Sequence, residues 1–171
     1  LVMIVVPSRA NVSQYQALKQ KIDNLVGGVN GEYGTFGWAP IQYFYRSLDF
    51  GDLTTLYKVA DIALITPLRD GMNLVAKEFV ASKEDSKKGV LILSEMAGAH
   101  NELNDSISVN PQDRQDITEA LLRALTMPEE EQGQRLESMQ EKLRKYDVRN
   151  WAATFINEQK KLMESQRENI I

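Results

Sequence analysis

The 171-residue chain contains no cysteine, and its one histidine is His100. The absence of cysteine excludes disulfides, a thiolate nucleophile and thiolate metal sites. It also fits a reducing compartment, so we expect a cytoplasmic location. A single histidine excludes a metal site built from several imidazoles.

Long apolar runs and an excess of positive charge are also missing. No run approaches the length that crosses a membrane. The formal net charge is −4, which argues against a nucleic-acid-binding surface. The hydrophobic share of 43% and charged share of 26% are ordinary for a globular domain. We therefore expect one compact domain with neither a nucleic-acid nor a membrane partner.

The first residues form the unbroken apolar run Leu1–Val6. Its β-branched residues do not alternate with polar ones, which predicts a strand buried on both faces. A chain that opens inside such a strand is expected to be a piece of a longer protein. The alternative is a processed natural terminus.

Short apolar strands alternate with helices through residue 127. This order predicts an α/β fold, with a doubly wound parallel sheet and helices on both of its faces. The expected strands are Leu1–Val6, Ile41–Tyr45, Ile62–Ile65, Val90–Leu93 and Ile107–Val109. The expected helices are a first one to Leu25 or Val26, Leu53–Val59, Leu74 to about Ser82, a short piece at Glu102–Leu103, and three from Asp113, Pro128 and Asn150 onward. We predict a domain over residues 1–127, with helices 128–171 packed on it.

A glycine-rich stretch between Gly27 and Gly37 contains five of the ten glycines. A phosphate-binding loop is one interpretation. Such a loop follows a strand and precedes a helix, whereas this stretch follows a helix and precedes a strand. We therefore predict that Gly27–Gly28 ends the first helix and that a long turn follows.

The nine residues Asp70–Glu78 carry the strongest functional signal. They follow the strand Ile62–Ile65 and lead through a glycine turn into a helix. A helix start presents free N–H groups and the positive end of the dipole, which suit phosphate. In parallel sheets, ligands bind beyond the carboxyl ends of the strands, where this turn is expected to lie.

Helical spacing from Leu74 assigns these side chains different tasks. Val75, Ala76, Phe79 and Val80 share a face that is expected to pack on the sheet. Glu78 points toward the start of the helix, where its carboxylate can accept two hydrogen bonds from a ribose diol.

The remaining groups of the turn are expected to serve the other parts of a nucleotide sugar. The N–H groups of Leu74 and Val75 suit a diphosphate, and Asp70 with the backbone of Met72 and Asn73 suits the sugar. The alternative is that Asp70 and Asn73 are turn and cap residues and that Glu78 is a solvated surface acid.

Several motifs together resemble one known family over nearly the whole chain. They are Val6–Arg9, Val29–Gly34, Trp38–Ile41, Thr66–Glu78, Ser94–Ala99 and Val109–Pro111. The chain is similar in these motifs to the carboxyl-terminal domain of the trehalose-6-phosphate synthase family, which are retaining glycosyltransferases with two Rossmann-like domains in the GT-B architecture. The resemblance implies transfer of glucose from UDP-glucose to glucose 6-phosphate, giving trehalose 6-phosphate and UDP, without a metal or cofactor.

The resemblance also implies a role for individual residues. The run from Leu74 through Val75, Ala76 and Lys77 to Glu78 would hold the nucleotide sugar, with Glu78 on the ribose. Asp70, Met72 and Asn73 would hold the donor glucose, and Asp70 is the candidate catalytic residue. Leu48 lies where the family contacts uracil.

Arg9 matches an arginine of the family that binds the acceptor phosphate. A planar guanidinium can contact phosphate through two hydrogen bonds. The alternative is a surface salt bridge, which is the commoner role of an arginine after a strand.

The chain departs from the family in what precedes it. The family's amino-terminal acceptor domain, and the arginine and lysine that bind the donor phosphates, belong to upstream sequence. We therefore expect the 171-residue chain to be inactive alone. His100 replaces a small residue and is either a surface histidine or a pH-sensitive contact.

Other assignments of function remain open at this stage. One is a regulatory subunit that binds nucleotide sugars without catalysis. Another is a signalling receiver, which would need an acidic cluster after the first strand, where the chain has Pro7-Ser8-Arg9. The sequence leaves open the preference for UDP or ADP and the formation of a homo-oligomer.

Overall fold

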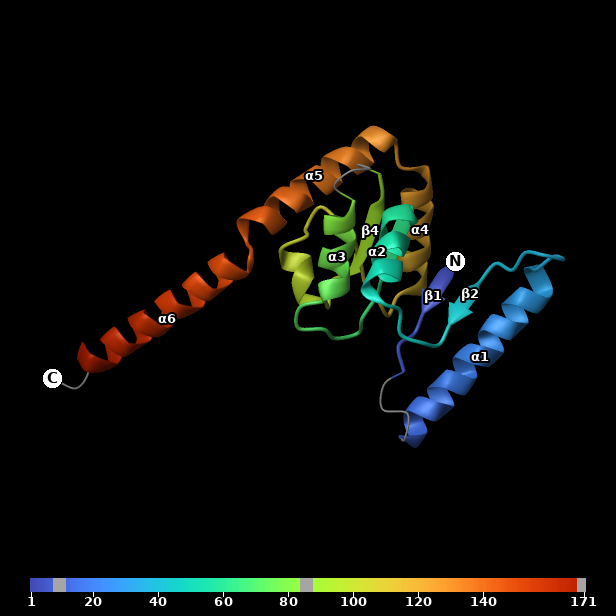
Figure 1. Cartoon of the computed structure of the whole chain (residues 1–171), viewed down its shortest axis with the longest axis horizontal. Coiled ribbons are helices and arrows are strands. Elements are labelled where there is room, and N and C mark those ends of the chain that lie inside the picture. Colours follow the sequence, from blue (N-terminus) through green and yellow to red (C-terminus); the bar gives the residue numbers. More distant parts are fainter. Residues whose placement is uncertain (8–11, 84–87, 169–171) are drawn as a thin grey trace. The chain divides into compact units, whose positions relative to one another are not determined.

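The computed structural model describes residues 1–7, 12–83 and 88–168 of the chain (Figure 1). It is an α/β structure that divides into two compact units, Leu1–Asp52 and Leu53–Ile171. The strands form two parallel sheets, where the alternation of strands and helices predicted one. Within the described part, none of the helices is long and apolar enough to cross a membrane.

The first unit contains a two-stranded sheet and a long helix. Strand β1 (Val2–Ile4) pairs in parallel with β2 (Gln42–Phe44), and Met3 lies opposite Tyr43. The prediction that the first strand is buried on both faces is wrong, because Leu1 is 67% and Val2 51% exposed. Strand β1 has β2 as its one neighbour in this sheet, and its residues are partly buried or exposed.

Helix α1 (Ser13–Tyr33) runs through the glycines that were expected to end it. The half-buried positions Ile22, Val26 and Val29 continue at helical spacing across Gly27 and Gly28. This apolar stripe outweighs the cost of about 1 kcal/mol that each glycine adds inside a helix. The predicted long turn is therefore confined to the residues after Tyr33.

The end of α1 is tied to the beginning of β2 by one side chain. The Asn30 amide donates to the Ile41 carbonyl and accepts from the Ile41 N–H, both at 2.9 Å. These two hydrogen bonds satisfy both backbone polar groups of Ile41, which explains why the helix persists to Asn30.

The second unit is built on three parallel strands in the order β3 (Ile62–Ile65), β4 (Val90–Ser94) and β5 (Ile107–Val109). Its first helices are α2 (Phe50–Val59), which begins in the first unit, and α3 (Leu74–Ser82). The 3₁₀ turn η1 (Gly98–Asn101) follows β4 and replaces the short helical piece expected at Glu102–Leu103. The last helices are α4 (Arg114–Thr126), α5 (Glu129–Lys145) and α6 (Val148–Glu168).

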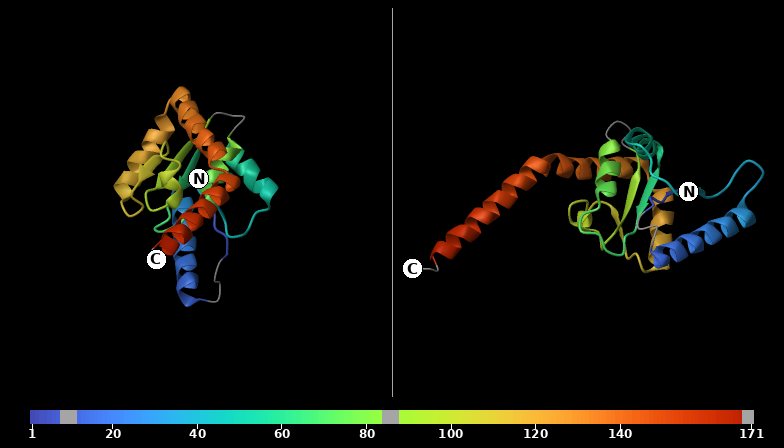
Figure 2. Two further views of the ribbon diagram at one scale, coloured as in Figure 1. Left: turned by 90° about the vertical axis from the view of Figure 1, so that its left-hand side faces the viewer. Right: turned by 60° about the horizontal axis from the view of Figure 1, so that its bottom comes forward.

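Helices cover both faces of this three-stranded sheet (Figure 2). Strand β4 is buried throughout and alternates between the two cores. Leu91 and Leu93 pack with Phe79 of α3 and Leu136 of α5 on one face. Val90 and Ile92 pack with residues of α4 on the other face. A continuous apolar run is what a strand covered on both sides requires, so the sequence pattern of β4 is explained.

A buried lysine joins the ends of α2 and α3. Lys83 is 2% exposed, and its ammonium donates to the carbonyls of Lys58, at 2.8 Å, and Ala60. The ammonium also lies 5.3 Å from the Phe79 ring centroid. Burial lowers the pKa of Lys83, and the charge of Asp61 acts in the opposite direction. These contacts hold the last turn of α2 against α3.

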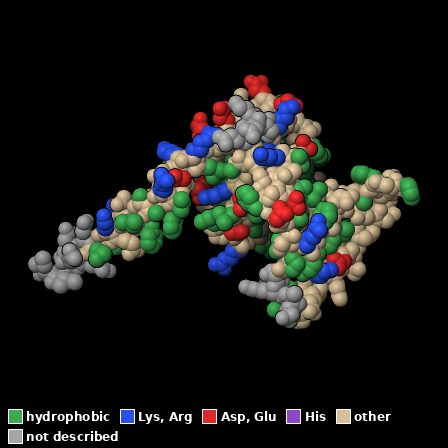
Figure 3. All heavy atoms as spheres, in the orientation of Figure 1, with side chains coloured by type: hydrophobic (Ala, Val, Ile, Leu, Met, Phe, Trp, Pro, Cys, Tyr) green, Lys and Arg blue, Asp and Glu red, His purple; other side chains and the backbone are tan. Residues whose placement is uncertain are grey.

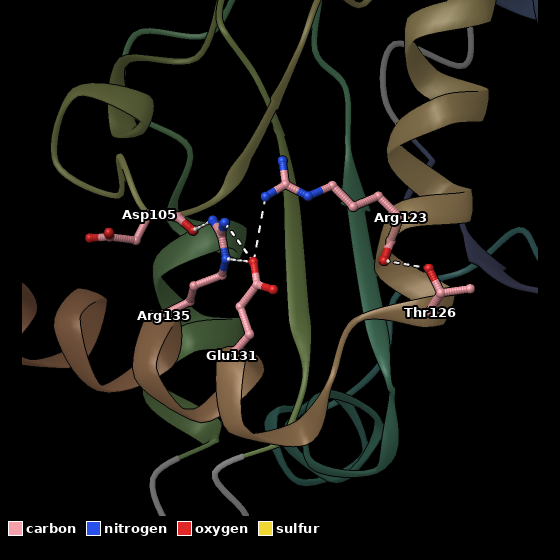
Figure 4. Close-up of polar contacts among 5 residues, drawn as sticks. All are labelled: Asp105, Arg123, Thr126, Glu131 and Arg135. Carbon is pink, nitrogen blue, oxygen red and sulfur yellow. Dashed lines mark hydrogen bonds and ion pairs between the residues drawn. The ribbon is translucent and has the colours of Figure 1, made fainter.

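Glu131 connects α4 and α5 through two arginines (Figure 4). Its Oε1 accepts from Arg135 at 2.8 Å and from Arg123 at 3.4 Å. Arg135 also donates to the Asp105 carbonyl at 2.9 Å, in the connection between β4 and β5. The network around Glu131 fixes α5 against the strands that it covers.

Pro128 comes immediately before α5 rather than at its first helical position.

Helix α6 presents an apolar surface to solvent (Figure 3). Trp151 and Phe155 stack at 5.7 Å between ring centroids, yet they are 63% and 55% exposed. No described side chain of α6 is buried. The helices after residue 128 therefore differ, because α5 contributes to the core and α6 does not.

Candidate functional site

Two loops at the carboxyl ends of β3 and β4 are held together by backbone hydrogen bonds. The Asp70 N–H donates to the Met96 carbonyl at 3.3 Å, and the Gly98 N–H donates to the Asp70 carbonyl at 2.9 Å. The Ala99 N–H donates to the Met72 carbonyl at 2.6 Å. Residues 70–72 are thus fixed by the neighbouring loop.

Ser94, the last residue of β4, supports the same junction. Its hydroxyl donates to the Pro67 carbonyl at 2.8 Å and accepts from the Met96 N–H at 3.0 Å. Since Ser94 is fully buried, losing either bond would leave buried polar groups unpaired.

Gly98 allows the two loops to approach this closely. A Cβ atom at this residue would lie 2.1 Å from the Gly71 carbonyl oxygen, which is backbone and cannot rotate away. Any side chain at residue 98 would therefore push the loop that carries Asp70 away from the loop after β4.

Asp70 is held as an ionised carboxylate inside its own turn. One oxygen accepts from the Met72 N–H at 3.0 Å, and the other accepts from the Asn73 side-chain amide at 3.0 Å. The bond from Met72, followed by that from Asn73, lowers the pKa of Asp70 below its usual value. The carboxylate therefore has a fixed orientation and carries a charge at neutral pH.

Asn73 caps helix α3 from a left-handed backbone conformation. Its φ is 74°, a conformation that only a few per cent of residues other than glycine adopt. Its side-chain oxygen accepts from the Ala76 N–H at 2.9 Å. The side chains of Asp70 and Asn73 thus make turn and cap hydrogen bonds, and their contacts to a sugar stay a prediction. A cap in this conformation is also typical of backbone shaped for a ligand.

The start of α3 leaves two backbone donors open. In residues 12–83 and 88–168, we find no acceptor for the N–H groups of Leu74 and Val75. Ala76 is fully buried and its N–H already donates to the Asn73 side chain, so this residue presents no open donor to a ligand. The prediction that Val75 packs on the sheet is wrong, because it is 44% exposed. The buried stripe is Ala76, Phe79 and Val80, and Val75 lies at its edge.

Glu78 lies one turn further along α3 and is exposed. Its side chain is not simply solvated, because the Tyr57 hydroxyl donates to its Oε2 at 3.2 Å. Glu78 is therefore a surface acid that also has a hydrogen-bond partner on α2. The carboxylate retains lone pairs for further donors.

Lys77 is engaged by an acid that was not singled out in the sequence. Its ammonium lies 2.8 Å from both carboxylate oxygens of Glu102. The Lys77 side chain is 20% exposed and that of Glu102 40%. Because this pair crosses from α3 to the residue after η1, it reinforces the junction between the two loops.

Three further residues were singled out in the sequence. Leu48 belongs to the first unit, in the turn between β2 and α2, and is half-buried. Arg9 lies outside the described residues. His100 is partly exposed in η1, where its N–H donates to the Ala97 carbonyl at 2.9 Å.

The Tyr57 phenol should titrate well above the ordinary value of 10.0. Burial, then the charge of Glu78 and its hydrogen bond, raise the pKa of Tyr57 to about 12. An alkaline absorbance titration should therefore contain a step from Tyr57 with a midpoint of about 12. The Tyr57→Phe variant should lack this step. Glu78→Gln should lower its midpoint, but not to the ordinary value, because burial remains. A titration in which Tyr57→Phe leaves every step unchanged would contradict the assignment.

Comparison with known proteins identifies the family of the chain. The family model for glycosyltransferase family 20 matches residues 1–161. The chain belongs to glycosyltransferase family 20. The bifunctional trehalose-6-phosphate synthase/phosphatase of Thermoproteus tenax is 54% identical over 155 residues, which are 91% of this chain and 21% of that protein.

Two solved structures of relatives carry ligands. A trehalose-6-phosphate protein from E. coli, bound with UDP-2-fluoro glucose, is 42% identical with a TM-score of 0.87 over 92% of this chain and 35% of that one. An alpha,alpha-trehalose-phosphate synthase (UDP-forming) from Burkholderia xenovorans, in complex with glucose-6-phosphate, is 38% identical with a TM-score of 0.87, over 92% and 34%. The family 20 chain thus spans about a fifth to a third of the length of these relatives.

Three residues of the candidate site gained a role only from the structure. Tyr57 precedes β3 by several residues, and no periodic signal links it to Glu78. Glu102 follows the turn after β4, so its pairing with Lys77 depends on tertiary contact. Gly98 could have been noticed, because a glycine in a turn beyond a strand often permits close backbone approach.

Proposed function

We propose that this chain is the carboxyl-terminal, donor-binding part of a trehalose-6-phosphate synthase. It would bind UDP-glucose for retaining transfer of glucose to glucose 6-phosphate. Family membership and the ligands of the two solved relatives support the substrates. The observation that carries the proposal is the start of α3, where two open N–H groups lie between the carboxylates of Asp70 and Glu78 along the chain.

The proposed binding mode follows from the chemistry of these groups. The diphosphate accepts from the Leu74 and Val75 N–H groups at the positive end of the α3 dipole. The ribose hydroxyls donate to Glu78. The glucose lies toward Asp70, Met72 and Asn73. The family resemblance adds Leu48 at the uracil and Arg9 at the acceptor phosphate.

Asp70 is the candidate catalytic residue in this arrangement. Glycosyl transfer develops positive charge on the sugar ring, and a fixed negative charge nearby stabilises it. The hydrogen bonds from Met72 and Asn73 keep the carboxylate ionised and oriented, so no reorganisation is needed during reaction.

The proposal extends to the organisation of the whole protein. Residues 1–127 would form the Rossmann-like, doubly wound donor domain of a GT-B enzyme, with helices 128–171 attached to it. An amino-terminal domain would complete the acceptor site, and the protein would act in the cytoplasm. The donor base and any homo-oligomer are left to experiment.

Calorimetric titration of the 171-residue chain tests the proposal. UDP and UDP-glucose should bind, and ADP-glucose measures the discrimination between bases. Glu78→Ala should weaken all three ligands by about tenfold, because it removes a charged acceptor from the ribose. Glu137→Ala, which removes an exposed acid of α5, is the matched control and should change nothing. An unchanged affinity in Glu78→Ala would overturn the ribose assignment.

A further inference from the structure

We propose that Tyr57 is a positioning residue that holds the Glu78 carboxylate in place for a ribose diol. The inference rests on the proposed function and deepens it, because it adds a residue on another helix to the ribose site. Tyr57 itself would touch Glu78 and not the nucleotide. The Tyr57 hydroxyl donates to Glu78 Oε2 at 3.2 Å, and the two residues are 21 positions apart in the chain.

The contact joins two elements that are rigidly placed. Tyr57 belongs to α2, and its ring packs against the buried cluster that contains Phe79, Leu91 and Leu93. The next residue, Lys58, gives its carbonyl to the buried ammonium of Lys83 at the end of α3. Because the Tyr57 ring and the carbonyl of the following residue both have partners in the second unit, the hydroxyl occupies a defined point beside Glu78.

An exposed glutamate without such a partner would be poorly prepared for a ligand. Its side chain has several rotatable bonds, and fixing a rotamer-rich side chain on binding costs about 0.5–1.5 kcal/mol. A neutral phenol that donates to one oxygen fixes the carboxylate before the ligand arrives. The high pKa of Tyr57 ensures that the phenol remains a donor throughout the neutral range.

The hydrogen-bonding capacity of the carboxylate matches this arrangement. Two carboxylate oxygens offer about four acceptor positions, of which Tyr57 uses one. Two vicinal hydroxyls can occupy positions on the remaining lone pairs. The effect of Tyr57 should therefore depend on the ribose hydroxyls and be independent of the base and the phosphates.

The decisive experiment compares two ligands on the folded chain. Tyr57→Phe should weaken binding of UDP by about fivefold, because the carboxylate loses its preorganisation. It should leave binding of 2′,3′-dideoxy-UDP within about twofold of the original value. Tyr146→Phe, which alters an exposed tyrosine elsewhere in the second unit, is the control and should change neither affinity.

A double-mutant cycle with Glu78→Ala separates positioning from a structural effect. Tyr57→Phe should add no further loss once Glu78 is removed. Equal weakening of UDP and dideoxy-UDP, or a loss that persists beside Glu78→Ala, would overturn the inference. Unchanged UDP affinity in Tyr57→Phe would overturn it while leaving the proposed function intact. Failure of the unaltered chain to bind UDP would overturn both.

Discussion

Replacing Gly98 by alanine is expected to lower UDP affinity by at least about thirtyfold and the free energy of unfolding by about 2–3 kcal/mol. The added Cβ would lie 2.1 Å from the Gly71 carbonyl oxygen and 2.7 Å from its carbon. Neither atom can move without shifting the backbone. The loop must therefore separate from residues 96–99, which weakens three backbone hydrogen bonds of Asp70 and Met72.

The size of the binding loss follows from what this loop positions. It leads directly into Asn73 and the open N–H groups at the start of α3. A small displacement there would misplace the phosphate donors and Asp70 together, so several contacts would weaken at once. Thermal unfolding and calorimetry with UDP measure the two effects.

A glycine in an open position supplies the matched control. Gly28 lies inside α1, and a Cβ there meets nothing within 4 Å. Gly28→Ala should leave UDP binding unchanged and should stabilise α1 by about 0.5–1 kcal/mol, because alanine favours the helix. Similar UDP affinity and stability in Gly98→Ala and Gly28→Ala would show that the close approach at Gly98 is not needed for binding or folding.

Local patterns predicted the second unit well. The apolar run of β4, the glycine turn after β3 and the start of α4 are encoded by neighbouring residues. Asp113, for example, accepts from the Gln115 N–H at 2.8 Å and begins α4 where the sequence predicted a helix. Periodicity and capping act over a few residues, so one sequence is enough to read them.

The failures occurred where distant contacts override local preference. Glycines at 27 and 28 predicted a helix end, but the stripe through Ile22, Val26 and Val29 and the tether from Asn30 to Ile41 extend α1. Val75 was assigned to the buried face because a helical wheel does not show where the sheet ends. Local propensity is a weak prior that tertiary packing changes.

In the candidate site, too, the local features could be predicted and the contacts between distant residues could not. The tasks of Asp70, Asn73 and the helix start could be argued from strand, turn and helix order. The supports of these groups could not, because Tyr57, Glu102 and Gly98 come from other elements. Hydrogen bonds between separate elements leave no periodic trace in the sequence.

Replacing Asp70 by alanine is expected to reduce the free energy of unfolding by about 2 kcal/mol and to remove any preference that the glucose contacts give UDP-glucose over UDP. The variant loses a charged acceptor for the Met72 N–H and for the Asn73 amide. Hydrogen bonds to charged groups contribute about 1.5–3 kcal/mol each when buried, and partial exposure at Asp70 reduces this. The glucose preference should disappear because Asp70 is assigned to the sugar.

Asp70→Asn is the informative companion variant. Its side-chain oxygen can still accept from the Met72 N–H, but its amide cannot accept from Asn73. Asp70→Asn should therefore keep about half of the stability that Asp70→Ala loses, while it also loses the negative charge beside the glucose. Urea unfolding and paired titrations with UDP and UDP-glucose separate the two contributions.

The charge of Asp70 also makes its contribution depend on pH. Its native pKa is lowered from an ordinary value of 3.8, so the native state binds fewer protons than the unfolded state near that pH. The stabilisation is complete above the unfolded pKa and is lost as pH falls through the lowered native pKa. The stability difference between the original chain and Asp70→Asn should consequently shrink below about pH 4. A difference that stays constant as the pH falls would mean that the Met72 and Asn73 contacts do not depend on the charge of Asp70.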